Sequence, residues 1–95
     1  MESQIIAYRL LECVSPAGMK INVSISLTAP KEDQESGDWS CSFVIDGINN
    51  SYSRNVMGAD SVQCLLLSIK MLRAKLEYHQ KCGYRFTWLG NEAFL

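Results

Sequence analysis

Cysteine and histidine are the residues of this chain best suited to nucleophilic chemistry. His79 is the only histidine, and Cys64 lies near the start of a predicted helix, where the helix dipole lowers a thiol pKa. Fifteen residues of helix at about 1.5 Å each would place the two side chains roughly 22 Å apart. A nucleophile and its base must lie within hydrogen-bonding reach of each other. The sequence therefore predicts no catalytic dyad and no other catalytic residue.

Metal and anion sites are incomplete in the same way. His79 and Cys82 have the i, i+3 spacing of half a helical metal site, but no local cluster supplies two further ligands. The segment Gly58–Ser61 precedes the helix without the glycine density or the lysine of a phosphate loop. Within it, the Asp60 carboxylate would cap the helix and repel a phosphate. We therefore predict no metal and no cofactor.

Four cysteines and a balanced charge restrict the classes of function further. None of the cysteines forms a CxxC pair, and two of them, Cys41 and Cys64, occupy positions where a small apolar side chain packs. The net charge is −1 and the basic residues are scattered, which disfavours nucleic-acid binding. The longest apolar run is 64–67, too short to span a bilayer, and a signal peptide is absent. These features predict a cytoplasmic protein that binds no membrane.

The first half of the chain alternates with the period of a strand. Lys20–Ala29 is apolar on one face, whereas 5–14 is apolar on both, so its second face requires a cover. The turn Ser15–Gly18 joins these two strands into an antiparallel hairpin. Pro30–Asp38 is polar and acidic, which predicts an exposed loop that either faces a basic partner or is merely solvated.

A second hairpin is predicted around Asp46-Gly47, because this dipeptide favours a two-residue type I′ turn. The strand 39–45 enters the turn, and Ile45 would then oppose Ile48. Three aromatic residues of this region and of the last strand could line a small-molecule pocket between sheet and helix, although aromatic side chains at strand spacing more often belong to the core. They are Trp39, Tyr52 and Trp88.

A long helix is predicted from Ser61 to Gln80, with Asp60 as N-cap and Gln63 completing a capping box. Gly83 can adopt the left-handed conformation that ends a helix, and 84–89 predicts a short final strand. His79, near the helix C-terminus, is expected at the surface, where the dipole mildly favours its charged form.

The predicted helix carries two apolar stripes on nearly opposite faces. The first stripe consists of Val62, Leu65, Leu66, Ile69, Leu72 and Leu76. The second stripe consists of Cys64, Leu67, Met71, Ala74 and Tyr78. The first would pack on the sheet, with Ser68, Lys75 and His79 in a polar band beside it. The second needs a cover, which is either internal, from the C-terminal segment Phe94-Leu95 or the final strand, or a partner chain, most simply in a two-fold dimer.

Three segments resemble a family of small uncharacterised bacterial domains. They are Gly37–Gly47 (GDWSCSFVIDG), Gly58–Leu67 (GADSVQCLLL) and Thr87–Gly90 (TWLG). The resemblance covers most of the chain. It implies a bacterial origin and a hairpin–hairpin–helix–strand order, and it implies no activity, cofactor or site residue.

Together these patterns predict a single α+β domain over residues 1–95. It should contain an antiparallel four-stranded meander, one long helix packed on one face, and a short C-terminal strand. The predicted function is a non-catalytic cytoplasmic interaction protein, a homodimer or the binder of another protein, for example an immunity or accessory protein. Its interface would be the second helical stripe. The alternative is a small-molecule-binding domain with a pocket between sheet and helix.

Overall fold

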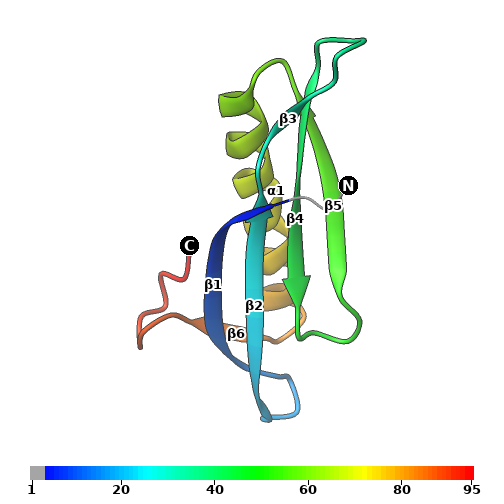
Figure 1. Ribbon diagram of the computed structural model, residues 1–95. Coiled ribbons are helices and arrows are strands. Elements are labelled where there is room, and N and C mark those ends of the chain that lie inside the picture. The colour runs from blue at the N-terminus through cyan, green and yellow to red at the C-terminus, as the bar shows by residue number, and fades with distance from the viewer. Residues whose placement is uncertain (1–3) are drawn as a thin grey trace.

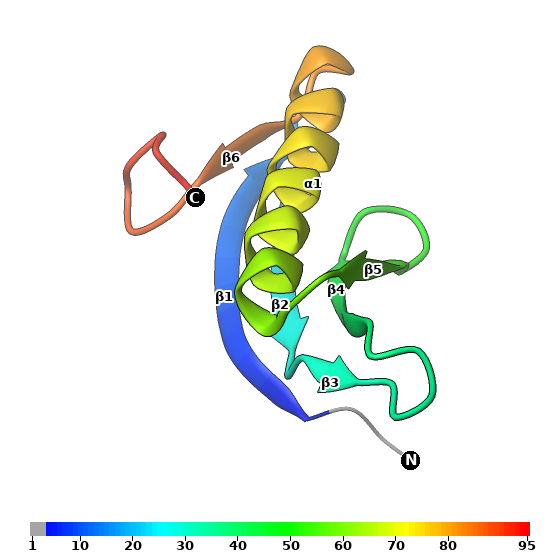
Figure 2. The same ribbon diagram turned by 90° about the horizontal axis from the view of Figure 1, so that it is seen from above.

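The computed structural model describes residues 4–95, which form six strands and one helix (Figure 1). In chain order these are β1 (Ile5–Val14), β2 (Lys20–Thr28), β3 (Lys31–Glu32), β4 (Trp39–Asp46), β5 (Tyr52–Gly58), α1 (Ser61–Lys81) and β6 (Arg85–Thr87). The strands build one antiparallel sheet, and α1 covers one of its faces (Figure 2). The molecule is elongated, with principal extents of 48 × 22 × 22 Å.

The α+β class, the long helix and the short last strand are confirmed. The four long strands β1, β2, β4 and β5 pair with their neighbours in chain order, and β6 pairs with the far edge of β1. The sheet has one strand more than predicted, because β3 forms inside the stretch expected to be a loop and pairs with the start of β4. The remaining loop is ordered by Asp33, whose carboxylate accepts hydrogen bonds from the backbone N–H groups of Glu35 and Ser36.

Thr28 marks the point where β2 gives way to β3. Its buried hydroxyl accepts a hydrogen bond of 2.7 Å from the Ser42 N–H and donates one of 3.3 Å to the Ser42 carbonyl. The side chain therefore replaces a ladder bond between backbones where Pro30, which has no N–H, follows. The sheet continues through this break into β3.

The connection between β4 and β5 differs from the predicted two-residue turn. Ile45 pairs with Tyr52, and residues 47–51 form the loop between the two strands, so Ile48 is not in a strand. Ile48 instead turns into the core, and Asn49 takes a positive φ of 52°. Gly47 has a φ of 116°, and a Cβ there would collide with the Asn22 carbonyl oxygen. Burial of Ile48 and this close approach to β2 outweigh the local preference for a tight turn.

Helix α1 begins and ends as predicted. The Asp60 carboxylate accepts a hydrogen bond of 2.7 Å from the Gln63 N–H, and the Gln63 side chain accepts one of 2.6 Å from the Ala59 N–H. The first is the N-cap bond of a capping box, whereas the return bond from the Gln63 side chain goes to the residue before the cap and not to Asp60 itself. At the other end Cys82 is the C-cap, and Gly83 follows with a φ of 102°.

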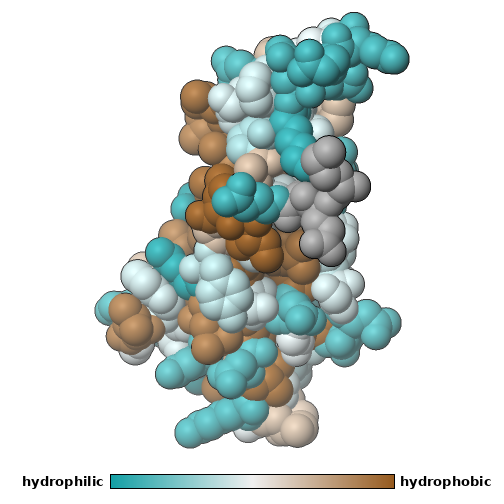
Figure 3. Space-filling view, in the orientation of Figure 1, coloured by the Kyte–Doolittle hydropathy of each residue, from teal (hydrophilic) through white to brown (hydrophobic). Residues whose placement is uncertain are grey.

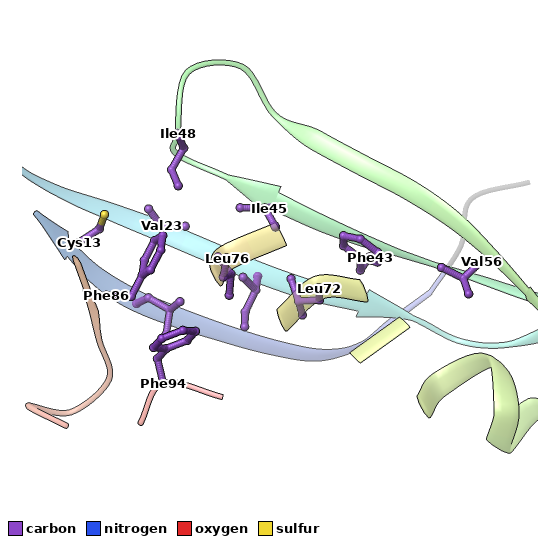
Figure 4. Close-up of a cluster of buried hydrophobic side chains, with 12 residues drawn as sticks. Cys13, Val23, Phe43, Ile45, Ile48, Val56, Leu72, Leu76, Phe86 and Phe94 are labelled. Carbon is purple, nitrogen blue, oxygen red and sulfur yellow. The ribbon is translucent and has the colours of Figure 1, made fainter. Parts of the chain in front are cut away.

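The hydrophobic core lies between the sheet and one face of α1, and Figure 4 shows most of its side chains. From the helix it takes the residues Cys64, Ser68, Leu72 and Leu76. This line runs between the two predicted stripes, along the band expected to be polar. Ser68 is fully buried, whereas Val62 and Leu66 of the first stripe are each 63% exposed. The prediction that the whole first stripe packs on the sheet is therefore wrong.

A hydrogen bond explains why a serine occupies the centre of the helix–sheet contact. The Ser68 hydroxyl lies 3.0 Å from the Cys41 thiol on β4, and both side chains are buried. Small side chains let the helix axis approach the sheet closely, and the mutual contact satisfies the two polar atoms. Hydrophobic periodicity gives a serine no weight, and so it misplaces the buried face.

The C-terminal segment closes the core on the β1 side. After β6, a turn bridges Trp88 and Asn91, and the chain returns so that Phe94 is buried. The Phe94 ring lies 5.5 Å from that of Phe86 and belongs to the same cluster as Leu72 and Leu76. This tail therefore covers part of the first helical stripe and not the second.

Candidate functional site

The structure does not bring the five predicted interface residues together as one exposed face. Cys64 is fully buried in the core, while Leu67 and Met71 are partly buried against it. Ala74 is exposed, and Tyr78 is 55% exposed. In the described chain the second stripe is thus divided between the interior and the solvent.

The β4–β5 hairpin provides most of the internal cover for this stripe. Met71 and Tyr78 border a shallow depression of about 250 Å³ that Phe43 and Tyr52 close from the sheet side. Over it, the Lys75 ammonium lies 4.5 Å from the centroid of the Tyr52 ring and 4.9 Å from that of Tyr78. The internal cover predicted from Phe94-Leu95 is wrong, because these residues lie on the other side of the helix.

The apolar surface that remains open lies instead around the first half of β1. On the outer face of the sheet, Ile6, Tyr8 and Leu10 are 48%, 65% and 51% exposed. The sequence indicated that a strand apolar on both faces requires a cover, and residues 4–95 provide none for this face. Figure 3 shows apolar surface over the start of β1 and over the neighbouring first turns of α1.

On the inner face, a groove of about 320 Å³ separates β1 from the helix. Its apolar lining comes from Ala7, Ile25, Leu27, Ile69, Leu72 and Leu95. Leu95 of the tail borders this groove, and the preceding Phe94 is buried in the core. Leu66 and Val62, about one and two turns before Ile69, continue the apolar helix surface next to the groove. We call this groove together with Ile5, Ile6, Tyr8, Leu10, Val62 and Leu66 the β1 surface.

Between these two flanks, β1 has a free edge. Its pairing with β6 is confined to Glu12–Val14, so within the described chain no strand pairs with residues 5–11 on that side. Ser15 N–H donates to the Met19 carbonyl across the hairpin, which fixes the alternation of the ladder. From Ala7 onward, odd-numbered residues of β1 then direct their N–H and C=O groups toward β2, and even-numbered residues direct theirs outward; before Ala7 the register shifts, and the Gln4 carbonyl accepts a hydrogen bond from the Ala29 N–H. Tyr8 and Leu10 therefore present backbone donors and acceptors at the edge.

Arg9 is the one charged residue in the open part of the strand, and its charge is held away from the edge. Its guanidinium carbon lies 3.7 Å from the centroid of the Trp88 ring, and Nη1 donates a hydrogen bond of 2.9 Å to the Phe94 carbonyl. Arg73 similarly donates to the Leu95 carbonyl at 3.2 Å. Both arginines fasten the tail. Charged side chains commonly protect an edge strand, and Arg9 does not serve in that way here.

The three aromatic residues of the alternative pocket are far from one another. Tyr52 and Trp39 lie at opposite ends of the β4–β5 hairpin, since they pair with Ile45 and Gly58 respectively. Trp88 follows β6 on the other side of the sheet and stacks with Arg9. The predicted shared pocket is therefore wrong, and the inner groove is lined by none of the three.

The thiols and the histidine are placed for packing. Burial raises the pKa of the Cys64 thiol, and the nearby Cys41 and Asp60 add to this effect. Burial also raises the pKa of Cys13. For His79, burial first and the Lys75 charge second lower the pKa, so the expected preference for the charged form is wrong. The His79 ring lies 5.5 Å from those of Tyr78 and Tyr84.

Residues 4–95 contain no group of three potential ligands that could hold a metal ion. Among the described elements, α1 is not long and apolar enough to cross a bilayer. Cys41 and Cys64 are buried, as their packing role predicted.

Comparison with known families places the chain. A family model described as a domain of unknown function, DUF6968, matches residues 7–94, and the chain belongs to this family. The match spans β1 to the buried Phe94, and so it includes both the free edge and the tail that closes the core. No curated protein and no solved structure matches the chain.

Proposed function

We propose that this protein is a non-catalytic interaction protein of the bacterial cytoplasm, which binds a protein partner through the β1 surface. The carrying observation is the coincidence of a free strand edge with two apolar flanks. Monomeric proteins blunt such edges with charge, proline or a covering segment. From Ala7 to Leu11 this edge has neither proline nor a charge directed outward.

The size of the exposed patch supports the same proposal. Six large apolar side chains of the β1 surface are each about half exposed or more. At roughly 100 Å² per side chain they present on the order of 600 Å², near the about 800 Å² that each partner buries in a standard interface. Contiguous exposed patches of this size commonly mark interaction sites. A helical stripe divided between core and solvent supports an interface less well, so the proposed surface moves from Met71 and Tyr78 to β1.

Two further features support a non-catalytic cytoplasmic role. The four cysteines are free thiols, which suits a reducing compartment. The groups whose pKa values are displaced, at Cys13, Cys64 and His79, are displaced mainly by burial, as is usual for side chains that pack in a core. If the partner is a different protein, the protein would act as an accessory or immunity protein that binds it.

Site-specific photo-crosslinking in cells tests the proposal. A photoreactive amino acid replaces Leu66 in one variant and Lys81 in the control, because both positions are exposed on α1 and only Leu66 belongs to the β1 surface. We expect a discrete protein adduct from position 66 and none from position 81. Absence of any adduct at position 66, together with an unchanged fold by circular dichroism, would contradict an interaction role for this surface.

The groove itself favours a second candidate function. Its volume of about 320 Å³ lies within the range of small-molecule sites, and Arg9 and Arg73 stand beside an otherwise mainly apolar lining. This composition suits an elongated apolar molecule with an anionic end. Thermal stabilisation by a medium-chain fatty acid such as decanoate, abolished in Ala7→Trp, is the expected result. Equal melting temperatures with and without decanoate would count against this alternative.

A further inference from the structure

From the free edge of β1 we infer that the protein partner is a second copy of this chain, joined by antiparallel pairing of the two β1 strands about a two-fold axis. The inference rests on the proposed function, because it names the occupant of the β1 surface. Such pairing would extend the two sheets into one continuous sheet and remove both open edges.

The hydrogen-bonding phase of the edge permits this pairing. Tyr8 and Leu10 direct their N–H and C=O groups outward, because the odd-numbered residues from Ala7 onward already bond to β2. An axis at Tyr8 places this residue opposite Tyr8 of the second copy, as a hydrogen-bonded pair that exchanges both backbone bonds. Leu10 then lies opposite Ile6 of the second copy. The irregularity in β1 pairing between Ile5 and Ala7 falls at the end of the paired segment.

The side chains are self-complementary in the same register. On the outer face, Ile6, Tyr8 and Leu10 meet the same three residues in reverse order, so an apolar row faces an apolar row. On the inner face, Arg9 lies opposite Ala7 of the second copy, and the two arginines are not directly opposed. An axis at Arg9 would set these like charges against each other. The charge pattern thus excludes an axis at Arg9. An axis at Leu10 would require Glu12 to pair at an edge that β6 already occupies, so Tyr8 is the centre we infer.

The available area is sufficient for a stable pair. The patch of roughly 600 Å² counts only exposed side chains, and pairing also buries the backbone edge, which brings each copy close to the about 800 Å² of a standard interface. An isologous contact uses one patch twice, so each flank of the edge finds an apolar counterpart. The inner side chains of the added strand would lie over the groove that the tail leaves open.

Light scattering on the unmodified protein gives the first test. We expect a mass of twice the 10.7 kDa of one chain at tens of micromolar concentration. The one backbone hydrogen-bond donor that Tyr8→Pro removes points away from β2. This variant should therefore have the monomeric mass and keep the circular dichroism spectrum of the folded protein. Tyr8→Thr keeps that N–H and should retain the dimer. A monomeric mass for the unmodified protein would overturn the inference.

Disulfide trapping tests the register. Cys82 is the exposed cysteine and is first replaced by serine. Residues opposed across a hydrogen-bonded pair have Cα atoms about 5.5 Å apart, which suits a disulfide, so Tyr8→Cys should give a covalent dimer under mild oxidation. In the control Glu12→Cys, on the same face of β1, the two sulfur-bearing residues would lie roughly 27 Å apart and stay uncrosslinked.

The outcomes separate this inference from the proposed function. A dimer in which Glu12→Cys crosslinks and Tyr8→Cys does not would overturn the pairing at Tyr8. A monomer whose position 66 still forms an adduct with a different protein would overturn the self-pairing and leave the proposed function standing. A monomer without any adduct would remove both.

Discussion

Single small residues set how closely the helix approaches the sheet. Ser68 and Cys64 of α1 are fully buried, and the Ser68 hydroxyl lies against the Cys41 thiol on β4. At the start of the helix, a Cβ on Gly58 would collide with the backbone nitrogen and Sγ of Cys64. Larger side chains at these positions would push the layers apart. The most critical packing positions of the helix are therefore among its least hydrophobic.

Two substitutions test whether a buried small residue of α1 matters more for stability than an exposed large apolar one. Ser68→Leu adds apolar volume where there is no space and should lower the free energy of unfolding by about 1–3 kcal/mol. Leu66→Ser removes an apolar side chain that is 63% exposed and should change it by less than about 0.5 kcal/mol. Urea denaturation at low protein concentration, where association contributes little, measures both. The opposite ranking would mean that the helix packs through its first stripe after all.

His79 makes stability depend on pH. Its pKa is lowered in the folded chain, first by burial and then by Lys75, from the usual value of about 6.5. The folded state therefore takes up the proton less readily than the unfolded chain. Stability is unaffected by this group above pH 6.5 and falls as the pH drops below it. His79→Gln should flatten the decline of the melting temperature between pH 7 and pH 5. An identical decline in both proteins would contradict this effect.

At the scale of elements, β1 combines two different environments in one strand. Its second half is held between β2 and β6, with Leu11 and Cys13 in the core. Its first half pairs on one side only and exposes apolar residues on its outer face. β6 is only three residues long, and so it leaves the first half of β1 without a second neighbour. The length of β6 thus determines where the β1 surface begins.

The β4–β5 loop provides a prediction at the same scale. Gly47→Ala would force an alanine into a φ of 116° and against the Asn22 carbonyl, so we expect a loss of about 2–4 kcal/mol in stability. Gly18→Ala is the matched control, because Gly18 has a φ of 84° with no atom near its missing Cβ. It should lose only about 1 kcal/mol. Similar denaturation midpoints for the two variants would show that close approach to β2 does not matter.

The sequence predicted elements well where the signal was local. Strand alternation placed β1 and β2, and the Asp60–Gln63 box placed the helix start. Long-range packing decided what failed: burial of Ile48 overrode the tight turn, and the Ser68–Cys41 contact moved the buried face of α1. The candidate site had one usable signal, the apolar character of both faces of residues 5–14. Which of those faces stays exposed depends on where β6 and the tail pack. Their packing is a long-range contact that no local sequence pattern specifies.

At the scale of the whole molecule, the tail divides the space between β1 and α1. Phe94 fills the part of this space that lies next to Phe86. Arg9 and Arg73 hold the tail in place, because their side chains donate hydrogen bonds to the backbone carbonyls of Phe94 and Leu95. On the other side of Leu95 the space between β1 and α1 remains open as the groove. The same segment therefore completes the core and borders the β1 surface, so packing at one end of the strand affects how much of the strand is exposed at the other.

Phe94→Ala separates these two roles of the tail. The ring is 8% exposed and packs 5.5 Å from Phe86, so its loss should cost about 3 kcal/mol of stability. Leu89→Ala, in the same segment but 77% exposed, should cost less than about 0.5 kcal/mol. Loosening the tail also extends the free edge of β1 toward Glu12, so amide hydrogen exchange should rise along Leu10–Glu12 in Phe94→Ala only. Unchanged exchange there, alongside the expected loss of stability, would mean that the tail supports the core without protecting the strand.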